Sequence, residues 1–179
     1  ELTPLYGQAI AIQYQDLTQN MSRHDVLELG AGTGALAISL LQSLQKADAL
    51  PDTYYILEVS ADCRQRQQTR IQAEAPDLFP KVVWLDTLPS SPISGMVIAN
   101  EVLDAMPVHK FQVSVSGIAE YAVTHASQQL QWQLAPSSNP NLIKQVSALQ
   151  LPGDPPYCSE LNPSLSTWIH SLSDSLRQG

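Results

Sequence analysis

The sequence predicts an α/β fold in which a parallel sheet is flanked by helices, with an antiparallel insertion after the fourth strand. Apolar runs alternate with helical patterns over residues 1–100, which is typical of βαβ units. A turn with three glycines joins the first of these runs to a helix. Residues 111–134 instead alternate between apolar and polar side chains with a period of two, as antiparallel strands do.

The first half of the chain is expected to contain parallel strands and the helices that connect them. Thr3-Pro4 begins a helix, because proline suits the first helical position. Ser60 can cap a later helix that ends before Pro76 and carries on its polar faces Arg64, Gln67, Gln68 and Arg70. The expected strands are residues 25–30, 54–59, 81–85 and 95–100, and the helix after the first strand spans about 33–47.

The second half is expected to hold an antiparallel insertion at residues 108–135, followed by a proline-rich stretch. Its strands are predicted at 111–116, 119–124 and 130–134, with a short helix at 141–149. A final helix begins at Pro163, and its apolar positions are Leu165, Trp168, Ile169, Leu172 and Leu176. A further strand should then follow Gly179 to cover the edge of the fourth strand. We therefore expect 1–179 to be a single partial domain, truncated at both ends, unless a partner chain supplies the missing strands.

The composition excludes several classes of protein. With 179 residues, of which 44% are hydrophobic, the chain can fold as one globular domain. Nine Lys and Arg against 17 Asp and Glu give a net charge of −8, which argues against nucleic acid as a partner. Cys63 and Cys158 lack metal-ligand spacing, so we expect neither a disulfide framework nor a metal site. Without a visible membrane span or signal peptide, a soluble protein of a reducing compartment is the default expectation.

The most informative segment is the glycine turn at Gly30, Gly32 and Gly34. Glycine permits positive φ and lets a ligand approach the backbone closely, so such a turn between a strand and a helix is typical of nucleotide binding. Its spacing is Gly-x-Gly-x-Gly, whereas a dinucleotide fingerprint is Gly-x-Gly-x-x-Gly. Glu28 in the preceding strand would repel a pyrophosphate and would suit a cation. The turn therefore favours S-adenosylmethionine, whose sulfonium and ammonium are cationic, over the alternative of a tight turn in an unrelated α/β domain.

Two further carboxylates are candidates for cofactor binding. Glu58 ends the second expected strand, where an acidic residue can accept hydrogen bonds from both ribose hydroxyls of an adenosine group. Asp86 follows the third strand and could reach the adenine amino group. The alternative for both is a solvated carboxylate in a loop.

Asn100, Glu101 and Asp104 are the candidate catalytic residues. They follow the fourth expected strand, and ligands of open α/β sheets bind outside the carboxyl ends of the strands. Methyl transfer depends on alignment of nucleophile, methyl carbon and sulfur, and a nitrogen nucleophile must also lose a proton. Paired carboxylates could orient a guanidinium or amine and assist that loss. Alternatively, Asp104 caps a turn and Glu101 braces the loop.

These segments, taken in order, resemble the MidA-like S-adenosylmethionine-dependent methyltransferases. The matching segments are Glu1-Leu2-Thr3-Pro4-Leu5-Tyr6-Gly7, Glu28-Leu29-Gly30-Ala31-Gly32-Thr33-Gly34, Glu58-Val59-Ser60, Asn100-Glu101-Val102-Leu103-Asp104-Ala105-Met106-Pro107-Val108 and Glu160-Leu161-Asn162-Pro163. The resemblance implies a Rossmann-like class I methyltransferase fold and methylation of a protein arginine. The family includes a mitochondrial assembly factor that methylates a subunit of respiratory complex I, so a respiratory subunit is one implied partner. The implied compartment is the cytoplasm, or the mitochondrial matrix in a eukaryote.

The chain departs from this family in three places. Ala31 stands where members usually have proline, the upstream Gly-Asp-Phe stretch is absent, and so is the Asp-Tyr-Gly strand expected after Gly179. Two alternatives stay open on the sequence: a non-catalytic assembly factor that retains the fold, and a nicotinamide-dependent oxidoreductase. The oligomeric state is not predicted.

Overall fold

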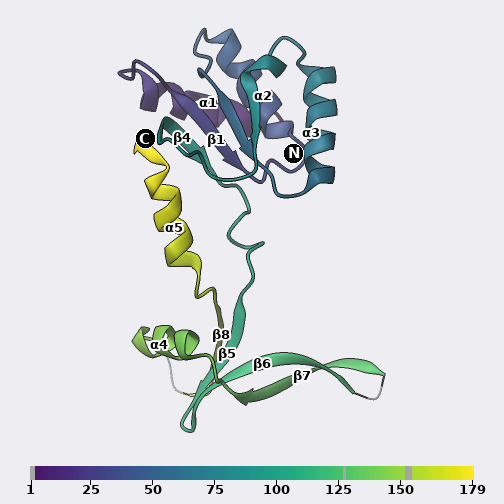
Figure 1. The fold of residues 1–179 in the computed structure, drawn as a ribbon, viewed down its shortest axis with the longest axis vertical. Coiled ribbons are helices and arrows are strands. Elements are labelled where there is room, and N and C mark those ends of the chain that lie inside the picture. The colour runs from purple at the N-terminus through teal and green to yellow at the C-terminus, as the bar shows by residue number, and fades with distance from the viewer. Residues whose placement is uncertain (1–2, 127, 152–154) are drawn as a thin grey trace. The chain divides into compact units, whose positions relative to one another are not determined.

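A computed structural model describes residues 3–126, 128–151 and 155–179, and these form two compact units (Figure 1). The first unit comprises Glu1–Asp104 with His170–Gly179, and the second comprises Ala105–Ile169. Each unit has its own sheet and its own cluster of buried apolar side chains.

The first unit contains a parallel sheet of five strands in the order β3-β2-β1-β4-β9. The strands are β1 (Asp25–Leu29), β2 (Tyr54–Leu57), β3 (Val82–Leu85), β4 (Ile93–Ile98) and β9 (Leu176–Gln178). β1 lies in the middle and pairs with β2 and β4, so its carboxyl end adjoins the ends of both neighbours. This arrangement confirms the predicted α/β fold with a parallel sheet.

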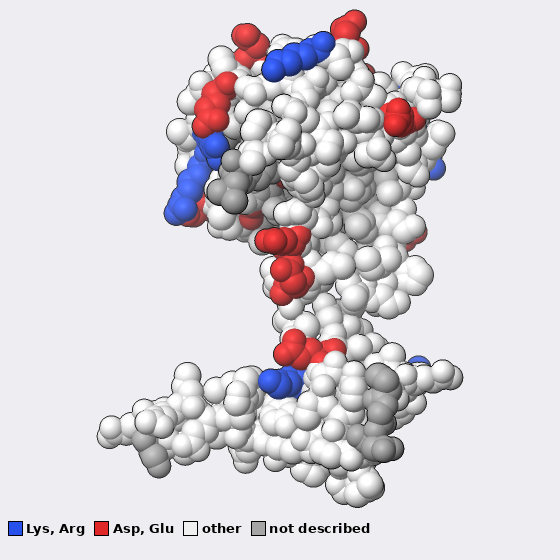
Figure 2. Space-filling view, turned by 180° about the vertical axis from the view of Figure 1, so that it is seen from behind, with Lys and Arg blue, Asp and Glu red and all other residues white. Residues whose placement is uncertain are grey.

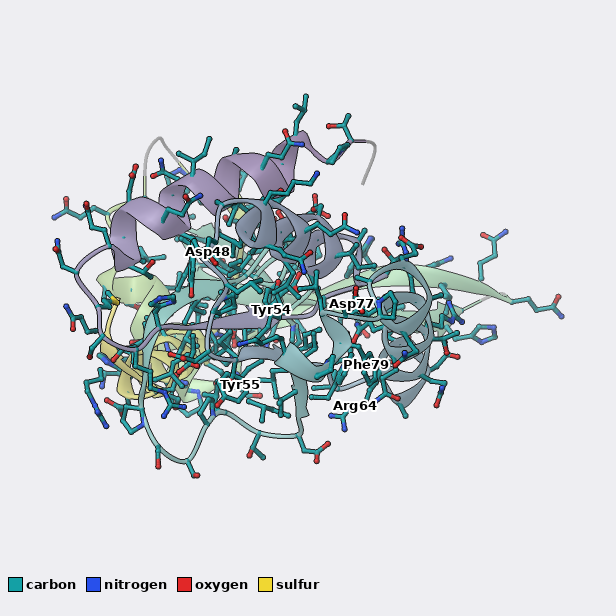
Figure 3. The ribbon with its side chains drawn as sticks, turned by 90° about the horizontal axis from the view of Figure 1, so that it is seen from above. Asp48, Tyr54, Tyr55, Arg64, Asp77 and Phe79 are labelled. Carbon is teal, nitrogen blue, oxygen red and sulfur yellow. The ribbon has the colours of Figure 1, made fainter. Side chains whose placement is uncertain are left out.

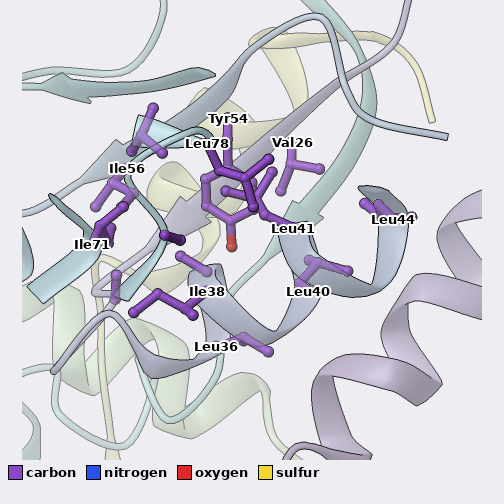
Figure 4. Close-up of a cluster of buried hydrophobic side chains, with 14 of the residues drawn as sticks. Val26, Leu36, Ile38, Leu40, Leu41, Leu44, Tyr54, Ile56, Ile71 and Leu78 are labelled. Atoms are coloured by element: carbon purple, nitrogen blue, oxygen red, sulfur yellow. The ribbon is translucent and has the colours of Figure 1, made fainter. Parts of the chain in front are cut away.

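Helices α1 (Leu5–Thr18), α2 (Ala35–Lys46) and α3 (Ala61–Glu74) contribute to one core cluster with the sheet. Leu40, Leu41 and Leu44 recur along α2 at helical spacing and are fully buried. They belong to the same cluster as Tyr54 of β2, as Figure 4 shows. The core therefore holds α2 in place directly after the glycine turn.

The second unit contains an antiparallel sheet in the order β7-β6-β5-β8. Its strands are β5 (His109–Ser114), β6 (Gly117–Ala126), β7 (Gln129–Pro136) and β8 (Tyr157–Leu161). Helix α4 (Pro140–Ala148) is capped by the Asn139 side chain and buries Leu142 and Val146 against Phe111. The predicted antiparallel strands are confirmed, and β8 is an additional strand that pairs with β5.

The end of the chain differs from its prediction. Helix α5 is Leu165–Asp174, and Leu176 is the first residue of β9 rather than part of the helix. β9 pairs with β4 in parallel, so the prediction that a covering strand begins only after Gly179 was wrong. The physical reason is that β4 needs a backbone partner at this edge, and Ile93 N–H donates to Ser175 C=O at 3.0 Å.

Two surface observations complete the description. On the face drawn in Figure 2, Lys and Arg side chains form no extended basic patch, and acidic side chains lie beside several of them. No helix within the described ranges combines the length and apolarity that a bilayer crossing requires.

Candidate functional site

The glycine turn forms a left-handed bend at the carboxyl end of β1. Gly30, Gly32 and Gly34 have φ of 64°, 53° and 76°, conformations that residues with a side chain rarely adopt. Gly30 N–H donates to Leu57 C=O at 3.0 Å, which ties the bend to the end of β2. A Cβ added to Gly32 would meet no atom within 4 Å, so open space lies directly in front of this backbone.

A cavity of about 350 Å³ lies against this turn. The lining residues come from the ends of β1 and β4 and from the start of α2: Glu28, Gly30, Ala31, Gly32, Thr33, Ala35, Leu36, Asn100 and Glu101. Its volume falls at the lower end of the range of small-molecule sites. Glu28 is buried and accepts a hydrogen bond from the Tyr54 hydroxyl at 2.8 Å. The cavity is therefore edged by two carboxylates, an environment suited to a cationic ligand.

A second cavity of about 320 Å³ lies at the ends of β2 and β3, and Glu58, Arg64 and Asp86 are among its lining residues. Val59 also lines it and is 95% exposed, an unusual state for a valine. Val59 was not among the predicted site residues. Its position directly after Glu58 and its exposure give this cavity an apolar wall.

Gln67 hydrogen-bonds to one lining residue of each cavity, Gly32 in the first and Glu58 in the second. Its side-chain amide donates to Gly32 C=O at 3.0 Å and to the buried Glu58 carboxylate at 2.9 Å, while its carbonyl accepts from the Trp84 indole at 3.0 Å. The prediction that Gln67 lies on a polar face was wrong, because the side chain is completely buried. One signal could have found it: Gln67 lies four residues before Ile71, so the two share the core-facing side of α3.

Glu58 itself is held by the start of α3. Its other carboxylate oxygen accepts from Ser60 N–H at 3.0 Å. Each carboxylate oxygen can accept more than one hydrogen bond, so these contacts leave capacity for ribose hydroxyls. The carboxylate is thus fixed before any ligand arrives.

Asp86 lies in an ion pair at the rim of the second cavity. Its carboxylate is 2.8 Å from the Arg64 guanidinium, which also donates to Leu85 C=O at 2.7 Å. Figure 3 places Arg64 toward the outside of the first unit and Tyr54 toward its interior. Sequence reasoning placed Arg64 only on a polar face and missed this contact.

The loop after β4 brings two of the three predicted catalytic residues to the first cavity. Asn100 lies beyond the strand, which ends at Ile98 rather than at residue 100, and its side-chain oxygen accepts from the Tyr6 hydroxyl at 3.0 Å. Glu101 has φ of 50°, and non-glycine residues with such backbones cluster at functional sites. Asp104 is exposed and lies outside the set of residues that line this cavity.

The first unit, a parallel sheet flanked by helices with a glycine turn at its central strand, has the fold of the class I methyltransferases to which the chain is similar. Residues 9–179 match the family described as "putative S-adenosyl-L-methionine-dependent methyltransferase", and the chain belongs to this family. The assignment agrees with the predicted cofactor, S-adenosylmethionine. No curated protein matches the chain.

Two solved structures from Burkholderia thailandensis are similar over nearly the whole chain. One is described as a "likely methyl transferase" bound to S-adenosyl-homocysteine; it is 30% identical, with a TM-score of 0.85 over 99% of this chain and 45% of that one. The other, an uncharacterized protein, is also 30% identical, with a TM-score of 0.85 over 97% and 46%. The chain therefore spans less than half the length of these relatives.

Proposed function

We propose that the protein transfers a methyl group from S-adenosylmethionine to an arginine side chain of a protein, as the MidA-like methyltransferases do. The observation that supports it best is the presence of two cavities at neighbouring strand ends, both with carboxylates, whose lining residues Gly32 and Glu58 are linked by hydrogen bonds from Gln67. S-adenosylmethionine, when bound, supplies an activated methyl group on a positively charged sulfur. The substrate would be a protein of the cytoplasm or, in a eukaryote, of the mitochondrial matrix, such as a respiratory complex subunit.

The residues present fit this cofactor. The open space before Gly32 admits a ligand against the backbone, and Glu28 provides negative charge in the same cavity. Glu58 would accept hydrogen bonds from the ribose hydroxyls. Val59 and Asp86 would contact the base in the second cavity.

Asn100 and Glu101 would hold the methyl acceptor. A carboxylate binds a guanidinium through paired charge-assisted hydrogen bonds, so Glu101 can orient an arginine and take the proton that its nitrogen loses. The Tyr6 hydroxyl fixes the oxygen of Asn100 and leaves the amide hydrogens of that side chain as donors. Asp104 would assist from the same loop and is assigned a secondary role.

Two alternatives lead to different outcomes. A nicotinamide-dependent oxidoreductase would have to place a pyrophosphate beside Glu28, which is electrostatically unfavourable. A non-catalytic assembly factor would retain the cavities and bind a protein partner without transferring a methyl group.

The test is a transfer assay on the whole protein with a radiolabelled methyl donor and cell lysate, followed by identification of the modified residue by mass spectrometry. We expect label on a protein arginine. Glu101→Gln should lower the transfer rate by about 100-fold, since loss of a general base typically has this effect. Donor binding should weaken far less, because Glu28 keeps its negative charge in the same cavity. Asp16→Asn, on the exposed side of α1, is the matched control and should transfer normally. Donor binding without any transfer would favour the assembly factor, and label on another residue type would reject arginine.

A further inference from the structure

The hairpin of β6 and β7 presents an apolar face that the described residues leave exposed. Leu130, Trp132 and Leu134 are 76%, 61% and 42% exposed. The register places Tyr121 opposite Leu134 and Val123 opposite Trp132, so all five side chains share one side of the hairpin. We call these five residues the hairpin face.

The aromatic rings of the hairpin face are already ordered. Tyr121 and Trp132 meet edge to face with ring centroids 6.1 Å apart, and Lys110 lies 5.0 Å from the Trp132 centroid. These contacts fix the orientation of the Trp132 ring against its own sheet but leave most of its surface accessible. A rigid, exposed tryptophan is typical of the centre of a protein interface.

β7 is also the outer strand of its sheet, with β6 on one side only among the described residues. Ser137 N–H donates to Ile118 C=O at 3.1 Å, and hydrogen-bonded pairs alternate along an antiparallel ladder. By this alternation, the backbone groups of Gln131 and Gln133 form hydrogen bonds with β6. The backbone N–H and C=O groups of the alternate residues point away from β6; these residues are Leu130, Trp132 and Leu134. Pro136, which has no N–H, falls in the outward set, as expected for an edge.

Natural proteins protect such edges with charges, prolines or bulges. Residues 129–135 contain no charged side chain and no proline. The outward groups of Leu130, Trp132 and Leu134 therefore form an edge that another strand can join.

The sequence of β7 indicates which strand that is. Residues 130–134 read Leu-Gln-Trp-Gln-Leu, which is the same in both directions about Trp132. We propose that a second copy of this chain pairs antiparallel with β7 about a two-fold axis at Trp132. Trp132 then lies opposite its own equivalent, and Leu130 lies opposite Leu134 of the second copy.

This pairing satisfies the requirements of an isologous interface. The same surface serves both copies, the outward backbone groups of both edges bond to one another, and residues 129–135 bring no charged side chain to the interface. The apolar residues form one continuous stripe across both copies, while Gln131 and Gln133 lie together on the opposite face. The palindromic sequence of β7 gives a self-complementary pairing only with a second copy of β7, and not with a strand of different sequence.

The first experiment introduces a charged residue at the proposed two-fold axis of the whole protein. Analytical ultracentrifugation measures whether the protein is a monomer or a dimer. The wild type should be dimeric at micromolar concentration. Trp132→Lys and Trp132→Glu should each weaken dimerisation by at least tenfold, because like charges then face each other, and an equimolar mixture should recover the dimer. Gln131→Lys adds the same charge on the opposite face and should remain dimeric. A monomeric wild type, or a mixture that stays monomeric although both variants fold, would overturn the proposal.

A second experiment tests the register of the pairing without introducing a charge and without changing Trp132. In a Cys63→Ser, Cys158→Ser background, Leu130→Cys and Leu134→Cys should crosslink rapidly with each other through a short bifunctional thiol reagent. Leu130→Cys alone should crosslink at least tenfold more slowly, since its own equivalent lies roughly 13 Å further along the strand. Equal rates in the two cases would contradict pairing centred on Trp132.

Discussion

At the scale of single residues, the proposed site relies on carboxylates that the protein positions before a ligand binds. Glu58 is buried and accepts hydrogen bonds from Ser60 N–H and from Gln67. A carboxylate fixed in this way loses little conformational freedom when a ribose binds, which favours affinity.

Removing this carboxylate should weaken the cofactor complex. We expect Glu58→Ala to reduce S-adenosylmethionine affinity more than tenfold, which corresponds to about 1.4 kcal/mol. Isothermal titration calorimetry on the whole protein measures the effect, with Asp16→Ala as the control that deletes an exposed carboxylate of α1. An unchanged affinity in Glu58→Ala would remove Glu58 from the cofactor site.

Gln67 should affect both stability and binding. Gln67→Leu removes the hydrogen bonds that Gln67 makes with the Trp84 indole and with the Glu58 carboxylate. Because these groups are partly or fully buried, we expect the free energy of unfolding to fall by about 2–3 kcal/mol. Cofactor affinity should fall as well, because the link to Gly32 is lost. Urea denaturation and calorimetry test the two effects. Gln72→Leu, an exposed position on the same helix, should change neither, and equal behaviour of the two variants would contradict the assigned role.

The buried role of Gln67 was difficult to predict because glutamine is mostly exposed in proteins. In contrast, Gly30, Gly32, Asn100 and Glu101 could be placed together from the sequence. They follow strands whose apolar runs are readable, and the carboxyl ends of parallel strands lie at one edge of a sheet.

At the scale of elements, the strands with clear apolar or alternating runs were predictable, whereas β8 and β9 were not. β8 has alternating half-buried and exposed residues and follows a proline-rich stretch, so it gives a weak signal. β9 is only three residues long and continues directly from the apolar pattern of α5. Both strands exist because they satisfy the edges of β5 and β4, which is a tertiary requirement that local sequence does not reveal.

The antiparallel sheet also contains a pH-dependent contact between β5 and β6. A hydrogen bond from His109 lowers the pKa of the Glu120 carboxyl below its ordinary value of 4.5, and Ser137 also donates to this carboxyl. A carboxyl group whose pKa is lower in the folded than in the unfolded protein stabilises the fold at pH values above its pKa in the unfolded protein. This stabilisation is lost as the pH falls through the pKa that the group has in the folded protein.

We therefore expect Glu120→Gln to cost about 0.5–1 kcal/mol at pH 6, a modest value because both side chains are partly exposed. The difference from the wild type should decrease as the pH falls below 4.5. Chemical denaturation at a series of pH values measures it, with the exposed Glu160→Gln in β8 as control. A difference that persists undiminished in acid would show that the contact is not ionic.

At the scale of the whole molecule, the chain combines a parallel sheet that carries the proposed cofactor site with a second unit that has its own core. The first unit carries the glycine turn, both cavities and Glu101, while the second carries the hairpin face. The family assignment covers residues 9–179 and so includes both units. Methyl transfer and self-association can accordingly be tested by separate substitutions.

The most direct test of the cofactor claim is a calorimetric titration of the whole protein with S-adenosylmethionine, comparing wild type with Gly32→Ala. The added methyl group enters the open space in front of the turn, so we expect at least a tenfold loss of affinity. Gly117→Ala is the matched control, because it adds a methyl group at another open position with positive φ, in the second unit, and should bind as the wild type does. Equal affinities in Gly32→Ala and wild type, or preferential binding of a nicotinamide dinucleotide, would contradict the account.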